Sequence, residues 1–148
     1  MPEGENQVLA DAQFGTFIYE ESTEWFETKA TLAELPISLS ITAMTEDEAA
    51  PILAQARAFW TDEAGWLARL KEKAADDLLE IANEWNDEDD AVPIDRENFL
   101  SRLTLESIVM EGDDRFSAYF NDGDLFWGHT ILVHGSISGG PQGAETAR

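Results

Sequence analysis

The sequence predicts a single domain of the α+β class, built on a mostly antiparallel sheet of about six strands. Three segments with strand character precede a long stretch with helical spacing, and three more follow it. The chain of 148 residues has the usual length of one domain, and 43% of its residues are hydrophobic, enough for a core without a metal or a disulfide. We therefore expect two long helices and one short helix packed on one face of the sheet.

Three strands are predicted before the helices. Residues 14–19 are rich in aromatic and β-branched side chains, and residues 20–24 supply a polar turn. Residues 25–31 alternate in part, and residues 37–43 alternate cleanly between apolar and hydroxyl side chains. This pattern is typical of an antiparallel meander with one face toward solvent.

The helical stretch begins at a capping box, in which Thr45 is followed three residues later by Glu48. Pro51 leaves the first residue of this helix open, because proline is tolerated only in the first turn. A second helix is expected after Thr61 or Asp62. Its apolar residues form one stripe at helical spacing, which we expect to be buried against the sheet: Leu67, Leu70, Ala74, Leu78, Ile81 and Trp85.

After the long helices, Asp95 can cap a short helix that runs to Leu103. Residues 105–110, 116–120 and 125–134 then read as strands joined by turns rich in Gly, Asp and Asn. The helical stretch is long enough to form a crossover connection. The strand before it and the strand after it can therefore be parallel neighbours in the sheet, and the strand order is open.

The domain boundaries follow from the same pattern. Residues 1–12 show little periodicity and are expected to be a disordered lead-in, and residues 137–148, rich in glycine, a flexible tail. Residues 13–136 are then the single folded domain.

Charge is the most unusual property of the chain, because 31 Asp and Glu face 9 Lys and Arg, for a net charge of -22. A negative field of this size repels nucleic acids and anionic membranes, so we expect direct binding to neither. It favours a basic protein as partner, although acidity that serves only solubility or salt adaptation explains the same number. The oligomeric state is open.

Several enzyme classes are excluded by what the sequence lacks. It contains no cysteine, so thiolate metal sites and cysteine nucleophiles are impossible. It also lacks a phosphate-binding glycine loop, a nucleophile elbow and a zinc-protease helix motif. No signal-like or membrane-spanning stretch is present, which indicates a cytoplasmic protein. We predict no cofactor, metal ligand or catalytic residue.

The densest group of chemistry-bearing residues lies between positions 121 and 129, where Asp122, Asp124, Trp127 and His129 form a candidate functional cluster. Carboxylates suit Mg²⁺ or Ca²⁺, and histidine suits transition metals. The spacing does not match a known metal loop, however, and Asp122-Gly123 is typical of the positive-φ positions of a hairpin turn. We therefore favour a turn with a structural histidine over a metal site.

Two further features are candidate contact surfaces. Consecutive aromatics, Trp25-Phe26 and Phe126-Trp127, place one ring inward and one outward if they lie on strands. An acidic patch follows the second helix and contains no basic residue. Its members are Glu84, Asp87, Glu88, Asp89 and Asp90.

Four segments together resemble a bacterial family known as domain of unknown function 2262. They are Phe14-Gly15-x-Phe17, Trp25-Phe26, the stretch from Phe99 to Ile108, and the Asp122-Gly123-Asp124-Leu125-Phe126-Trp127-Gly128-His129 motif with Ile131 and Val133. The resemblance spans roughly Phe14 to His134 and implies a bacterial cytoplasmic protein. It implies no activity, cofactor or site residue.

Three functions are compatible with these observations. The leading hypothesis is a non-enzymatic acidic interaction domain, such as an inhibitor, an immunity-type protein or a regulatory protein, that meets a basic partner. One alternative is a divalent-metal-dependent enzyme that uses the cluster at residues 121–129. The other is an inhibitor whose acidic patch imitates nucleic-acid phosphates.

Overall fold

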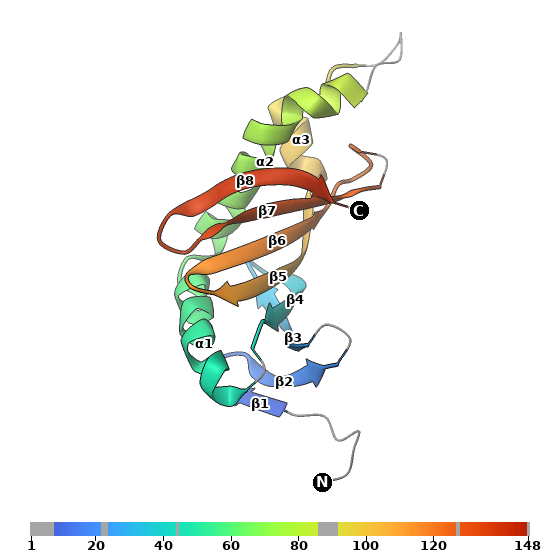
Figure 1. The fold of residues 1–148 in the computed structure, drawn as a ribbon. Helices are drawn as coiled ribbons and strands as arrows, with labels where there is room; N and C mark the ends of the chain where they lie inside the picture. The colour runs from blue at the N-terminus through green and yellow to red at the C-terminus, as the bar shows by residue number, and fades with distance from the viewer. Residues whose placement is uncertain (1–7, 22–23, 44, 86–91, 127, 148) are drawn as a thin grey trace.

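A computed structural model describes residues 8–21, 24–43, 45–85, 92–126 and 128–147. The chain folds into one eight-stranded sheet and three helices (Figure 1). The strands are β1 (Val8–Asp11), β2 (Gly15–Glu20), β3 (Trp25–Leu32), β4 (Leu35–Ile41), β5 (Thr104–Gly112), β6 (Arg115–Asn121), β7 (Thr130–Ser136) and β8 (Gly140–Ala147). The helices are α1 (Glu46–Trp60), α2 (Glu63–Trp85) and α3 (Arg96–Arg102).

The strands lie in the sheet in the order in which they occur in the chain. All neighbours are antiparallel except β4 and β5, which pair in parallel, with Ile41 opposite Met110. The three helices connect these two strands, so the crossover left open by the sequence is present. The molecule thus consists of two antiparallel meanders, β1–β4 and β5–β8, joined at one parallel pair.

The α+β class is confirmed, but the predicted six strands are corrected to eight. The two additional strands, β1 and β8, lie in the segments interpreted as a lead-in and a tail. Both are edge strands, which pair with one neighbour and need little apolar character of their own. β8 gains further support from α2, because the Ala144 N–H donates to Asp77 Oδ2 at 2.9 Å.

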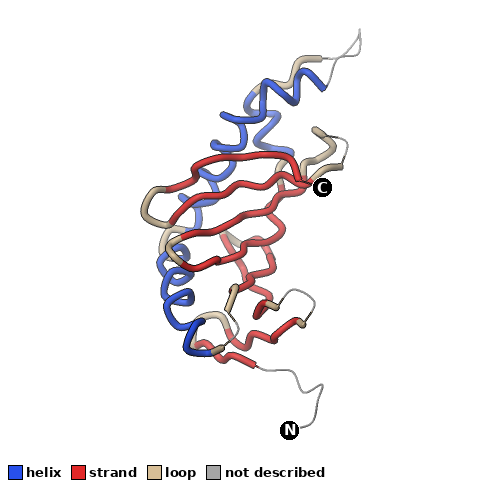
Figure 2. Tube along the Cα trace, viewed as in Figure 1, coloured by secondary structure: helices blue, strands red, loops and turns tan. Residues whose placement is uncertain are grey.

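The helices cover one face of the sheet, as the tube in Figure 2 shows. α1 contacts β4 and β5, while α2 contacts β3, β7 and β8. Register partners across β4, β5 and β6, such as Leu39, Ile108 and Ala118, lie beneath them and are fully buried. Among the described residues no helix lies on the opposite face, which we call the open face.

The predicted caps of α1 and α3 are present. Thr45 Oγ1 accepts a hydrogen bond from the Glu48 N–H at 3.1 Å, and Asp95 Oδ1 accepts one from the Asn98 N–H at 2.7 Å. In the described parts of the chain, no helix has both the length and the apolar composition required to cross a bilayer.

The buried stripe of α2 is rotated relative to the prediction. Ile81 is 38% exposed, and Leu67 and Trp85 are only partly buried. The buried positions are Trp66, Leu70, Ala74, Ala75, Leu78 and Ala82. Alanines bring the helix axis close to the sheet, so small side chains occupy the contact line and the larger Ile81 lies beside it.

Candidate functional site

The predicted cluster lies in the loop that joins β6 to β7, because β7 begins at Thr130 instead of position 125. The loop is organised around Asp122, whose side chain is buried. Its Oδ1 accepts a hydrogen bond from the Asp124 N–H at 3.0 Å. Its Oδ2 accepts two more, from the Phe126 N–H at 2.9 Å and the Gly128 N–H at 3.1 Å. One carboxylate therefore stabilises the loop along most of its length.

The tight turn at the start of this loop differs by one position from the prediction. The residues with positive φ are Gly123 and Asp124, instead of Asp122 and Gly123. A Cβ at position 123 would lie 2.5 Å from the Arg102 carbonyl oxygen, so only glycine fits there. The Arg102 Nε–H in turn donates to the Gly123 carbonyl at 3.0 Å, which fixes the turn against the end of α3.

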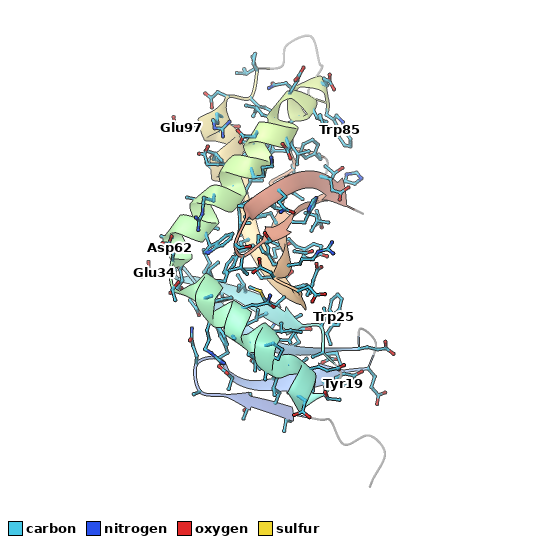
Figure 3. The ribbon with its side chains drawn as sticks, turned by 60° about the vertical axis from the view of Figure 1, so that its left-hand side comes forward. Tyr19, Trp25, Glu34, Asp62, Trp85 and Glu97 are labelled. Carbon is cyan, nitrogen blue, oxygen red and sulfur yellow. The ribbon has the colours of Figure 1, made fainter. Side chains whose placement is uncertain are left out.

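His129 is held inside the same loop. Its Nδ1 lies within hydrogen-bond distance of the Phe126 carbonyl, so this nitrogen carries the proton. The ring also stands edge-on to Trp85 at 5.6 Å between centroids, and Trp85 packs edge-on to Phe126 at 5.3 Å. Figure 3 labels Trp85 at the end of α2. Trp127, the fourth member of the predicted cluster, lies outside the described residues.

These contacts limit what the cluster can do chemically. Three backbone N–H groups already occupy the Asp122 carboxylate, and Asp124 points to solvent in an exposed turn. Among the described residues, no group of three or more His, Asp or Glu side chains is arranged to hold a metal ion. The geometry supports a structural loop that links α2, α3 and the sheet.

The predicted acidic patch is described at one member only. Glu84 is exposed in the last turn of α2. Asp87, Glu88, Asp89 and Asp90 lie outside the described residues.

The open face carries a second candidate site, around Trp25, and Trp25 is its only residue that the sequence analysis singled out. Phe26 is buried under the helices, and Trp25 lies on the open face, as the alternation of a strand requires. The strand register places Glu20 directly opposite Trp25 and Ile18 opposite Glu27. Ile18 is 43% exposed, which is unusual for isoleucine.

At the centre of the open face the side chains are small or carry a hydroxyl group. Ser40, Val109 and Ser117 are neighbours in the register of β4, β5 and β6, and all three are buried by the longer side chains around them. The Ser117 hydroxyl donates to Glu111 Oε2 at 2.7 Å. Of the charged residues beside it on this face, Glu111 and Arg115 are both exposed.

Positive charges are concentrated on the helices and are largely paired there. Ion pairs join Arg69 to Asp62 at 3.7 Å and Lys73 to Asp77 at 3.5 Å. Arg96 binds Glu72 and Asp76 together, and hydrogen bonds to these two carboxylates raise the pKa of its guanidinium. The acids of the open face have no such counterions: in the described part of the chain, Glu20, Glu27 and Glu111 form no ion pair.

The chain belongs to a bacterial protein family whose model matches residues 11–146 and which is described as "uncharacterized protein conserved in bacteria (DUF2262)". The match includes β8 up to Thr146 and so extends beyond the resemblance recognised in the sequence, which ends at His134. Searches of curated proteins and of solved structures return no match.

Proposed function

We propose that this member of the family is a non-enzymatic interaction domain, which binds a basic protein through the open face of its sheet in the bacterial cytoplasm. An inhibitor, an immunity-type protein or a regulatory protein would work in this way. The observation that carries the proposal is the environment of Trp25. This ring lies on a surface without a helical layer, beside Glu20 and Glu27, neither of which forms an ion pair within the described residues.

Trp, acidic side chains and an exposed Ile18 form a combination suited to a basic partner. Aromatic rings contribute large contact areas at protein interfaces, and they bind arginine by cation–π contact. Carboxylates without a counterion attract Lys and Arg and accelerate encounter with a basic surface. The metal-dependent enzyme has less support, because three backbone N–H groups already occupy the Asp122 carboxylate. The inhibitor that imitates nucleic-acid phosphates rests on the acidic patch, of which Glu84 alone lies within the described residues.

Two double variants test this proposal; each removes two negative charges, one from the open face and the other from the helices. Glu20→Gln with Glu27→Gln removes two charges from the open face, and Glu80→Gln with Glu97→Gln removes two from exposed positions on the helices. We expect the parent and the helix variant to retain the same basic protein from a bacterial lysate at low salt and to release it at high salt. The open-face variant should lose it.

Two results would overturn the proposal. One is the absence of any salt-sensitive basic protein among those retained by the parent. The other is equal retention by the open-face and helix variants, which would show that net charge alone is responsible.

A further inference from the structure

The pairing between β2 and β3 stops early and leaves an opening in the sheet. Only three register pairs join the two strands, and the last is Ile18 with Glu27. β2 nevertheless begins at Gly15 and β3 continues to Leu32. The first residues of β2 are paired with β1 alone. We call the space between residues 13–17 and residues 28–31 the β2–β3 gap.

Side chains replace the missing ladder on both sides of this gap. The Thr28 hydroxyl donates to the Thr16 carbonyl at 2.9 Å, at the narrow end. The Trp60 indole N–H, from α1, donates to the Thr31 carbonyl at 2.9 Å, at the wide end. Since alternate residues of a strand direct their backbone groups to the same neighbour, Lys29 also directs its N–H and carbonyl into the gap. In the register of the sheet, β3 therefore has no partner in β2 at Lys29 and Thr31, although the Thr31 carbonyl already accepts the Trp60 indole N–H.

Two hollows lie along this edge, and Lys29 lines both. The first, of about 340 Å³, is bordered by Glu20, Glu27 and Ile18 on the open face. The second, of about 320 Å³, is walled by the rings of Phe14 and Trp60, which meet edge-on at 4.9 Å.

The charges around the gap favour a basic occupant. The Lys29 ammonium donates to the Ser38 hydroxyl on β4 at 2.8 Å, so it points away from the gap. The acids of the first hollow, Glu20 and Glu27, therefore dominate its opening. The two rings on one side of the second hollow suit an aliphatic or aromatic side chain, and the rest of its lining, which includes Gln13 and Thr31, is mostly polar.

We propose that an extended, basic segment of the partner adds to the edge of β3 that faces the gap, with its backbone bonded to the N–H and carbonyl of Lys29 and to the N–H of Thr31. Its basic side chain would lie over Glu20 and Glu27, and an apolar side chain would enter the hollow beside Trp60. Strand addition of this kind derives affinity from main-chain hydrogen bonds and specificity from pockets for alternate side chains. This proposal rests on the proposed function, which it narrows from a face to a segment and a pairing mode.

A disulfide that closes the gap provides the test. Thr16 and Lys29 lie on the two sides of the narrow end of the gap, where the Thr28 hydroxyl reaches the Thr16 carbonyl, so Thr16→Cys with Lys29→Cys should form a disulfide that draws the two strands together in a chain that has no other cysteine. The probe is a set of short peptides selected on the parent protein from a random display library. We expect these peptides to bind the oxidised variant at least roughly tenfold more weakly than the same variant after reduction, which is its matched control.

A second pair of variants covers the case in which the disulfide form does not fold. Thr31→Pro removes the backbone N–H that the peptide would use, and Thr31→Val keeps it. Only the proline variant should weaken binding. Peptide should also slow hydrogen exchange at the N–H groups of Lys29 and Thr31 in the parent.

The outcomes separate this proposal from the proposed function. Equal binding to the oxidised and reduced forms, or unchanged exchange at Thr31, overturns strand addition. If those peptides still lose affinity for the open-face variant of Glu20 and Glu27, the proposed function stands. Selection of peptides without basic residues, or without salt-sensitive binding, overturns both.

Discussion

The loop between β6 and β7 and the gap between β2 and β3 are two places where regular pairing stops, and they treat their polar groups in opposite ways. In the loop, Asp122 satisfies three backbone N–H groups from within the protein. In the gap, the Thr28 hydroxyl and the Trp60 indole each donate to one backbone carbonyl, and Lys29 has no register partner in β2. The cluster of acids and histidine that is conspicuous in the sequence therefore serves the fold, whereas an ordinary stretch of Thr, Lys and Ala is the place where a strand lacks its partner.

We expect the largest loss of stability from weakening the packing of α2 on the sheet, because Trp85 connects that helix to the loop. Leu78 is 4% exposed, and truncation to Ala should lower the free energy of unfolding by about 2–5 kcal/mol through lost burial and a cavity. Ile81→Ala truncates a similarly large side chain at an exposed site, so it should lower the free energy of unfolding by less than about 1 kcal/mol. Urea unfolding of both variants measures the difference, and equal midpoints would mean that α2 is not docked as described.

Asp122 should be the most sensitive polar position of the loop. Replacement by Asn removes the charge and turns one acceptor into a donor that faces backbone N–H groups, so we expect a loss of about 2–3 kcal/mol. The matched change is Asp124→Asn in the same turn, which keeps a residue tolerant of positive φ and should cost less than about 0.5 kcal/mol. Denaturant unfolding compares them. A similar cost at both positions would contradict the assigned role of Asp122.

The gap should respond more weakly than the loop. Trp60→Phe keeps an aromatic ring but removes the N–H that donates to the Thr31 carbonyl. The adjacent hollow can hydrate that carbonyl, but the smaller ring also loses part of a buried contact, so we expect a cost of about 1–2 kcal/mol by thermal unfolding. A loss as large as that of Asp122→Asn would show that the gap is a tightly built part of the core.

The smallest effect is expected for metal ions. Titration calorimetry with Mg²⁺, Mn²⁺, Zn²⁺ and Ca²⁺ should show only diffuse binding to the acidic surface, unchanged by Asp124→Ala or His129→Ala. Saturable binding that either substitution abolishes would revive the metal-dependent enzyme and would break the contrast between loop and gap.

Much of the fold could be predicted because local patterns and tertiary contacts agree there. The hydroxyl and apolar alternation of residues 37–43 marks β4, and Thr45 and Asp95 cap helices through hydrogen bonds made within one turn. The edge strands could not be predicted, because residues 140–147 become a strand only through β7 and Asp77, which are distant in the sequence. Periodicity also placed Ile81 in the stripe of α2, since it cannot tell which side of an apolar band lies against the sheet.

The candidate site was harder to predict for a related reason. An Asp-Gly pair indicates a turn, and the turn is present, one position later than expected. That the Asp122 carboxylate would reach as far as Gly128 depends on the path of the whole loop. The β2–β3 gap has no local signal, because it arises from two strands that follow different neighbours.

The parallel pairing of β4 with β5 bears on how the chain matures during synthesis. The first meander emerges from the ribosome with Phe17 and Phe26 on its apolar face, well before α1 and α2 are available to cover them. The second meander is synthesised only after all three helices, so Ile41 of β4 cannot pair with Met110 of β5 before then. Closing such a distant contact is slow compared with forming hairpins. A nascent half of this acidic protein therefore depends on its charge, more than on its fold, to stay apart from its neighbours until the second meander arrives.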